Sequence, residues 1–506
     1  MLLAASNEAT SIIAIAVAIV ATLGLGAFGV RRGNTASDLF VASRSVTPGR
    51  NAAAICGEYL SAASFLGVAG LVMKFGVDML WYPISYTAGY LLLLFFVAAP
   101  LRRFGAYTIS DFAEGRLGSE SARRVASLLV VVVSGCYLVP QMRGAGITLH
   151  VLTGAPYWVG VVLVSSTVTI NVATGGMRGI TFVQGFQFWL KWAALAVPAL
   201  FVCAHFFANR IGWPTGAGDV GNWSRPIDSS QTFLSFPTYS LVSFVVAQTL
   251  GTLGLPHILV RFYTNPDGPS ARRTTVLVLS LLGAFYIFPP IFGAFGRLYA
   301  PDLLATNSAD TVVLLLPQRV FPGGLGQLLT AIVACGAFAA FMSTASGLTI
   351  SAAGAVSQDL LSGDKRGFRI GAAAIGVLSC LIGLRVATID INQLVSWVFA
   401  IAASSFTPLI LLGIWWRGLS ARGAIAGLVV GAGSATASVG LTLFGPSFTG
   451  WPHIILAQPA IWTIPTAFAT MVIGSRLTPK TRPKDVSGMM LTMHAPEALG
   501  LSRNYR

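Results

Sequence analysis

The chain has 506 residues, of which 55% are hydrophobic and only 10% are charged. Average soluble proteins carry about 25% charged residues, and a soluble fold of this size could not cover its surface with so few. The composition therefore excludes soluble enzymes and soluble binding proteins, and it indicates an all-α polytopic membrane protein.

The cysteines and the sequence motifs exclude several kinds of chemistry. All five cysteines lie inside apolar runs without a CxxC pair, which indicates small buried side chains rather than disulfides or a metal site. The sequence also lacks the GxxxxGK[ST] phosphate loop and the HExxH zinc motif. We therefore expect no enzyme activity, no cofactor, no bound nucleotide and no metal other than sodium.

About thirteen apolar segments are long enough to be predicted as transmembrane helices, since a spanning helix needs roughly 20 residues. Most of the connections between them are short. In chain order the segments are 9–30, 51–73, 79–101, 124–152, 157–175, 180–207, 233–260, 274–299, 326–357, 368–388, 391–416, 421–444 and 453–475.

The positive charges predict the orientation. With the N-terminus outside and the C-terminus inside, most Lys and Arg residues, Lys191 among them, fall on the inner side, as the positive-inside rule requires. The net charge of +15 then reflects topology and attraction to the bilayer rather than nucleic-acid binding. We expect a multi-pass protein of the plasma (inner) membrane. Arg143 lies inside a helix, and the outer side receives Lys74, Arg210, Arg225, Arg297, Arg319 and Arg385.

The odd number of segments allows one helix to precede two inverted five-helix halves, with two more helices after them. Inverted repeats of this kind place the substrate at mid-membrane, beside broken helices. We predict a single transporter domain over 1–506, comprising an extra helix 1–32, inverted repeats 50–207 and 233–417, two C-terminal helices 420–476 and a cytoplasmic tail 477–506.

Small residues and one acid mark the second segment. Gly57 permits local unwinding, which would free carbonyls to coordinate an ion, although small residues also serve close helix packing. Glu58 is the only acid well inside a segment, where a carboxylate costs about 2.5–3.5 kcal/mol. It is a candidate for ion coupling, for proton transfer or for an ion pair, and a position near the inner water is the alternative.

Arg143 lies deep in the fourth segment, close to Gln141 and Pro140. A guanidinium at this depth should face a cavity or an internal partner, and its fork geometry suits a carboxylate. Three uses remain open: binding a substrate carboxylate, pairing with Glu58, or reaching the outer membrane surface.

The seventh segment should break. Gly251, Gly254 and Pro256 interrupt it, and Thr249 and Thr252 lie near the interruption. In the proposed inverted repeat, this segment is the counterpart of the second one.

The ninth segment carries adjacent hydroxyls, Ser343 and Thr344, in a stretch without charge from 320 to 358. Oxygen ligands in an uncharged pocket suit a hard cation such as sodium. The alternative is that each hydroxyl bonds to the carbonyl of the preceding helical turn.

Five runs of sequence resemble the sodium:solute symporter family, and within it the cation–acetate permease branch. They occur in the family's order across most of the chain, and the fourth and fifth runs are specific to the acetate branch. The runs are 57–67 (GEYLSAASFLG), 141–146 (QMRGAG), 175–178 (GGMR), 254–262 (GLPHILVRF) and 340–347 (AFMSTASG).

The resemblance implies a five-plus-five inverted-repeat (LeuT-type) fold and a sodium site between two core helices. Carried over by position, its ligands would be the carbonyls of Gly57, Leu60 and Ala340 and the hydroxyls of Ser343 and Thr344. The chain departs from the acetate branch at two positions, with Glu58 in place of an expected Asp and Arg143 in place of an expected apolar residue.

Three functions remain open from the sequence. The first is inward symport of sodium with a small monocarboxylate such as acetate, propionate or pyruvate. The second is symport coupled to a proton on Glu58, or symport of another small organic solute, and the third is a membrane sensor without flux. In the first, Ser343 and Thr344 bind sodium, and the substrate is bound by Arg143, Gln141, Ser64, Thr249 and Thr252.

Overall fold

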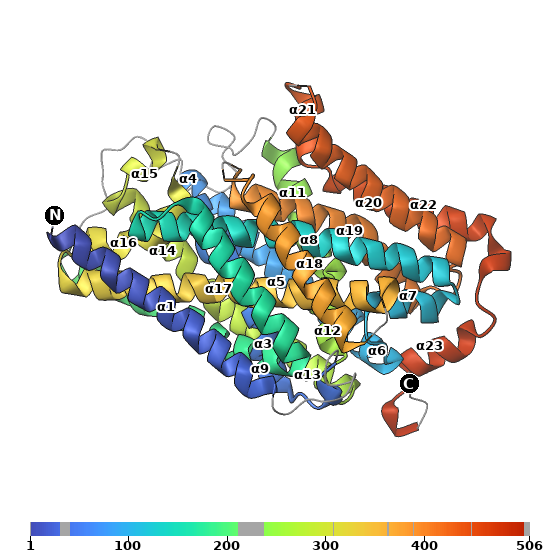
Figure 1. Cartoon of the computed structure of the whole chain (residues 1–506). Coiled ribbons are helices and arrows are strands. Elements are labelled where there is room, and N and C mark those ends of the chain that lie inside the picture. Colours follow the sequence, from blue (N-terminus) through green and yellow to red (C-terminus); the bar gives the residue numbers. More distant parts are fainter. Residues whose placement is uncertain are drawn as a thin grey trace.

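The computed structural model describes residues 2–30, 41–210, 237–306, 308–361, 364–387, 389–446 and 448–499. Within these ranges every regular element is a helix, and the long helices lie side by side in one bundle (Figure 1). Nine of the described helices are long and apolar enough to cross a membrane, and there are up to eleven if each of two bent helix pairs counts as one span. The all-helical membrane fold predicted from the composition is confirmed.

The helices fall into three groups along the chain. The first half contains α1 (Leu2–Val30), η1 (Ala42–Arg44), α3 (Pro48–Tyr59), η2 (Ala63–Gly67), α4 (Val68–Phe75), η3 (Gly76–Leu80), α5 (Trp81–Phe96), α6 (Ala98–Phe104), α7 (Ile109–Leu117), α8 (Glu120–Thr153) and α9 (Tyr157–Ala208). The second contains α11 (Pro237–Gly254), α12 (Pro256–Phe262), α13 (Gly268–Phe285), α14 (Phe288–Tyr299), α15 (Asp302–Ala305), η4 (Ala309–Thr311), α16 (Val312–Val320), α17 (Gly324–Leu360), α18 (Lys365–Gly383) and α19 (Ile391–Trp415). The third contains α20 (Ala421–Phe444), α21 (Trp451–Ala457), α22 (Ala460–Leu477), η5 (Pro479–Thr481), α23 (Val486–His494) and η6 (Glu497–Leu499).

Two of the nine spans each hold parts of two predicted segments. The 52-residue α9 contains both 157–175 and 180–207, and it is interrupted at Gly176, whose φ of 56° and ψ of −170° are accessible to glycine alone at low cost. The span Ala63–Phe96 joins the second half of 51–73 to most of 79–101. The predicted segments are therefore present as helices, although the bundle does not divide them as the apolar runs suggest.

Two core spans are broken, which positions the site. The first break follows α3, where Leu60 has non-helical dihedrals (φ −74°, ψ 85°) before the π-helical turn η2. Gly57, predicted as the unwinding point, is instead helical. Its missing side chain serves close packing, because a Cβ there would lie 2.2 Å from the carbonyl oxygen of Gln184 on α9.

The second break separates α11 from α12, which are bent by 45° at Leu255. Pro256 occupies the start of α12, where its missing N–H removes a backbone bond and its ring favours a new helix start. The predicted break of the seventh segment is confirmed.

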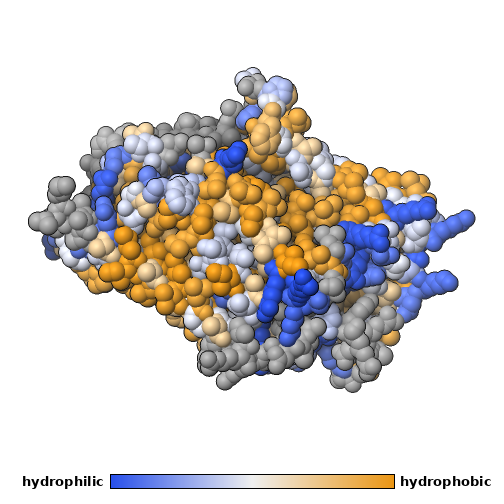
Figure 2. Space-filling view, in the orientation of Figure 1, coloured by the Kyte–Doolittle hydropathy of each residue, from blue (hydrophilic) through white to orange (hydrophobic). Residues whose placement is uncertain are grey.

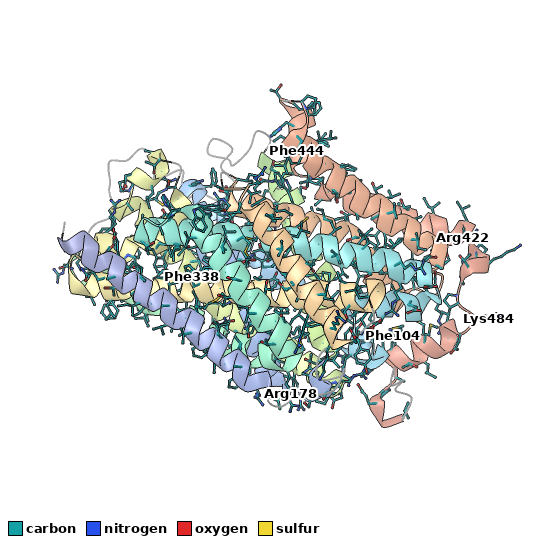
Figure 3. The ribbon with its side chains drawn as sticks, in the orientation of Figure 1. Phe104, Arg178, Phe338, Arg422, Phe444 and Lys484 are labelled. Carbon is teal, nitrogen blue, oxygen red and sulfur yellow. The ribbon has the colours of Figure 1, made fainter. Side chains whose placement is uncertain are left out.

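The surface agrees with a membrane protein. Figure 2 shows apolar residues across the middle of one face, with hydrophilic residues gathered mainly toward the right of that view. Arg422 and Lys484 project from the same end (Figure 3). The predicted tail 477–506 contains α23, and Glu497 Oε1 anchors the chain beyond α23 to α6 by accepting a hydrogen bond from Arg103 Nε at 3.0 Å.

Candidate ion and substrate site

The central helix α17 brings the predicted sodium ligands to the break after α3. It packs against α9, α8, α1 and α3, and Ser343 and Thr344 are fully buried. Thr344 Oγ1 donates a hydrogen bond to the carbonyl oxygen of Glu58 at 2.6 Å. The two parts of the chain predicted to share an ion are therefore in direct contact.

The ammonium group of Lys191 lies among these predicted ligands. Lys191, on α9, is fully buried, and its Nζ donates to the carbonyl oxygens of Gly57 and Leu60, the latter at 2.8 Å. The same nitrogen donates to Ser343 Oγ at 2.9 Å. Placing Lys191 on the inner side of the membrane was wrong, because this side chain turns into the core and takes three oxygens as acceptors.

The sequence allowed the hydroxyls of α17 either to reach a site between helices or to bond to the preceding helical turn, and the structure shows one hydroxyl doing each. Ser343 Oγ donates to the carbonyl oxygen of Ala340 at 3.1 Å, which is a bond within the preceding turn. Thr344 instead reaches across to α3. All five predicted sodium ligands are thus close together, and each is engaged by another group of the chain.

A second buried cation accounts for Glu58. Arg261 Nε, on α12, donates to Glu58 Oε2 at 2.6 Å, and both side chains are 1% exposed. Arg261 Nη1 also donates to Thr181 Oγ1 at 2.7 Å, and its Nη2 donates to Gln184 Oε1. Gln184 in turn donates to the carbonyl oxygen of Ser343 at 2.8 Å, so the ion pair and the Lys191 site form one hydrogen-bonded network.

Arg143 does not pair with Glu58. Its Nη1 lies 3.5 Å from Asp310 Oδ2, and the pair is about one-tenth exposed. Arg143 Nε is buried without a hydrogen-bond acceptor among the described residues. Asp310 lies in η4, between the membrane spans, and burial, reinforced by the charge of Asp390, raises the pKa of its carboxyl group to about 7.

The other predicted substrate residues surround a cluster of tyrosines. Ser64 Oγ lies 2.9 Å from Tyr286 Oη, and Thr252 Oγ1 lies 2.7 Å from Tyr59 Oη. Gln141 Oε1 accepts a hydrogen bond from the backbone N–H of Ala62 at 3.0 Å, next to the break after α3. Thr249 is half-buried and donates to the carbonyl oxygen of Ser85 at 3.3 Å.

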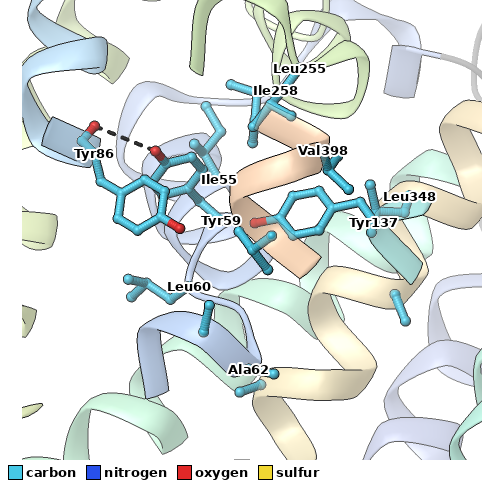
Figure 4. Close-up of a cluster of buried hydrophobic side chains, with 14 of the residues drawn as sticks. Ile55, Tyr59, Leu60, Ala62, Tyr86, Tyr137, Leu255, Ile258, Leu348 and Val398 are labelled. Carbon is cyan, nitrogen blue, oxygen red and sulfur yellow. Dashed lines mark hydrogen bonds between the residues drawn. The ribbon is translucent and has the colours of Figure 1, made fainter. Parts of the chain in front are cut away.

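The tyrosine cluster itself was not predicted. Figure 4 shows Tyr59, Tyr86 and Tyr137 converging beside Leu60 and Ala62, with the Tyr59 hydroxyl donating to the carbonyl oxygen of Tyr86 at 3.4 Å. The hydroxyls of Tyr82 and Tyr86 are buried without a partner among the described residues. Aromatic walls with unused hydroxyls next to a broken helix can hold a small polar solute.

The sequence analysis did not predict the buried contacts of three charged residues. The sequence signals that could have indicated these contacts differ among the three. Lys191 lies well inside the apolar run 180–207, so the reasoning applied to Arg143 could have found it. Arg261 follows an apolar run closely enough to be taken for an inner-face residue, yet it is 1% exposed. Asp310 lies in a connection, and its contact with Arg143 has no sequence signal.

Comparisons with known proteins identify the family of this chain. Residues 39–431 match the Sodium:solute symporter family. The chain is also 32% identical over 485 residues to the uncharacterized symporter YwcA of Bacillus subtilis (strain 168), a match that covers 90% of this chain and 92% of YwcA.

Solved structures support the fold. A Na+-coupled sialic acid symporter matches with a TM-score of 0.70 at 16% identity, covering 92% of this chain and 98% of that one. Mhp1, a nucleobase-cation-symport-1 family transporter, matches with a TM-score of 0.55 at 15% identity, covering 90% and 98%. MhsT in complex with L-phenylalanine matches with a TM-score of 0.52 at 17% identity, covering 84% and 98%. The predicted LeuT-type fold is confirmed.

The family match spans most of the chain, the relative is similar over nearly its whole length, and the fold is that of membrane transporters rather than enzymes. The chain therefore belongs to the sodium:solute symporter family.

Proposed function

We propose that this protein is a plasma-membrane symporter that imports a small monocarboxylate, such as acetate, propionate or pyruvate, together with a cation. The observation that carries the substrate class is Arg143. Its buried guanidinium has one N–H without an acceptor and a long 3.5 Å contact to Asp310. A planar fork of donors suits a carboxylate of the substrate, which would replace or join Asp310.

The surroundings fit a small rather than a large substrate. Gln141 holds the backbone at the break after α3, and Ser64, Thr249 and Thr252 line the tyrosine cluster. The runs 254–262 and 340–347, which resemble the acetate branch, support a short-chain monocarboxylate. This substrate class and the roles of these five residues are our proposal.

The identity of the coupling cation is a separate question. Family membership points to sodium, and the sequence also allowed a proton carried by Glu58. The second idea loses support because Glu58 is held in a buried ion pair with Arg261 at 2.6 Å. The guanidinium of Arg261 engages Glu58 Oε2, so this oxygen is not free to bind a coupling proton while the pair is intact.

Uptake into proteoliposomes tests the substrate class. Labelled acetate, propionate and pyruvate are supplied outside, with sodium and pH gradients imposed separately. Arg143→Gln should raise KM by about 10- to 100-fold, because a hydrogen bond to a charged group contributes about 1.5–3 kcal/mol. Arg319→Gln, which removes an exposed pair with Asp302, is the matched control and should leave KM unchanged. An unaltered KM in Arg143→Gln would remove this residue from the substrate site.

Another small organic solute is the second candidate, and the tyrosine cluster favours it. The hydroxyls of Tyr82 and Tyr86 lack partners among the described residues, and Tyr86 stacks on Tyr286 at 6.1 Å. Rings and hydroxyls arranged in this way would suit a neutral polar solute. Competition of labelled pyruvate uptake by a panel of neutral solutes separates the two candidates.

A further inference from the structure

Lys191 places a positive charge at the centre of the predicted sodium site. Its Nζ donates to the carbonyl oxygens of Gly57 and Leu60 and to Ser343 Oγ. An ammonium group has three N–H donors and no acceptor. Each donor has therefore found one oxygen, and all three oxygens belong to the set that the family resemblance assigns to sodium.

The remaining two predicted ligands are also engaged. The carbonyl oxygen of Ala340 accepts from Ser343, and Thr344 donates to the carbonyl oxygen of Glu58. A sodium ion at the same centre would need these oxygens and would lie against a second positive charge in a water-poor interior, where repulsion is strong. In this arrangement the site cannot hold both cations.

We propose that the ammonium group of Lys191 takes the place of the coupling sodium ion, so that these five oxygens do not form a sodium site while Lys191 is present. The proposal rests on the proposed function as a symporter. It differs from coupling through Glu58, whose charge is committed to Arg261.

The charged neighbours leave Lys191 without a carboxylate of its own. Of the titratable groups on α3, Cys56 and Glu58 are those that interact with Lys191, and Glu58 is paired with Arg261 on α12. The segment of α17 facing Lys191 offers the hydroxyls of Ser343 and Thr344 and no charged group. The printed hydrogen bonds of the ammonium group are therefore all to neutral oxygens.

Sodium binding tests the proposal without any substrate. The purified full chain in detergent is melted in sodium chloride and in choline chloride at equal concentration and pH. The wild type should have the same melting midpoint in both salts. Lys191→Ala should have a higher melting midpoint in sodium chloride than in choline chloride, because the freed oxygens and the vacated space suit the ion. Lys480→Ala, which removes a lysine near the surface, should behave as the wild type.

A higher wild-type melting midpoint in sodium chloride than in choline chloride would overturn the proposal. This test uses the wild type alone, so it remains valid if Lys191→Ala does not fold. A folded Lys191→Ala without a sodium response would also count against it, because the five oxygens would then form no cation site.

Uptake supplies the second readout. Labelled pyruvate is the solute, because it is more fully ionised at neutral pH than acetate. Liposomes without protein measure the background uptake. A sodium gradient at equal pH should not drive wild-type uptake, because the ammonium group of Lys191 occupies the oxygens that would bind the ion. Uptake driven by sodium alone would overturn the proposal. It is also possible to separate the two proposals. If no gradient drives uptake of any monocarboxylate and the wild-type melting midpoint is the same in sodium chloride and in choline chloride, the substrate proposal fails and the Lys191 assignment stands.

Discussion

Two buried cations, Lys191 on α9 and Arg143 on α8, occupy different environments in one bundle. Lys191 is fully buried and donates to three oxygens, so its charge is saturated within the protein. Arg143 keeps one N–H without an acceptor and holds Asp310 only at 3.5 Å. The comparison suggests that the first cation joins helices and that the second is available to a substrate.

The carboxylates near these cations follow the same division. Glu58 pairs with Arg261 at 2.6 Å with both side chains 1% exposed, close to Lys191. Asp310 approaches Arg143 from η4, a short element outside the spans. The same chemical change, from carboxylate to amide, can therefore be made in both regions and its effects compared.

The largest effect is expected from Glu58→Gln. Arg261 would be left buried with an uncompensated charge, and removing one partner of a buried pair costs about 3–5 kcal/mol. We expect a large fall in the melting midpoint of the purified protein and loss of uptake. Glu120→Gln, which removes an exposed i,i+4 partner of Arg124, is the control and should change stability by no more than about 0.5 kcal/mol. A stable Glu58→Gln protein would contradict the assignment of this pair as structural.

A smaller effect is expected from Gly347→Ala on α17, which tests how tightly the Lys191 region is packed. A Cβ at Gly347 would lie 1.9 Å from Glu58 Oε1, so the pair with Arg261 would have to move. Overpacking of this kind typically costs about 1–3 kcal/mol. Melting of the purified variant measures it.

The matched control is Gly433→Ala on α20, where no atom lies within 4 Å of the new Cβ. Alanine replaces glycine in an exposed helix position there, so stability should rise by roughly 0.5–1 kcal/mol or stay unchanged. Equal effects of the two alanines would mean that the contact between Gly347 and Glu58 is loose.

The sequence predicted the fold well because apolar runs and charge bias carry it directly. It also predicted the meeting of Ser343 and Thr344 with the break after α3, through short motifs. What it could not predict is which cation meets which oxygen. The acceptors of Lys191 include the backbone carbonyls of Gly57 and Leu60, which every residue type possesses, so no side-chain pattern signals the contact.

The choice of partner for Glu58 had the same limit. Arg143 lies within one apolar run and Arg261 directly follows another, and only the packing of α12 against α3 brings Arg261 to the carboxylate. Topology rules assign a charge to a side of the membrane, and they fail for a long side chain that turns inward from the end of a helix.

The most diagnostic effect for the Arg143 region, which is smallest at acidic pH, is expected from Asp310→Asn. Burial, with Asp390 nearby, raises the pKa of Asp310 from its ordinary value of 3.8 to about 7. Between those values the folded protein keeps a proton that the unfolded chain has lost, so stability falls as pH rises and levels off above about pH 7. Asparagine does not titrate. The melting midpoint of the variant should therefore exceed that of the wild type by a margin that grows from pH 5 to pH 7 and is constant above about pH 7, whereas a difference that does not change with pH would mean that the carboxyl group of Asp310 is ionised throughout this range.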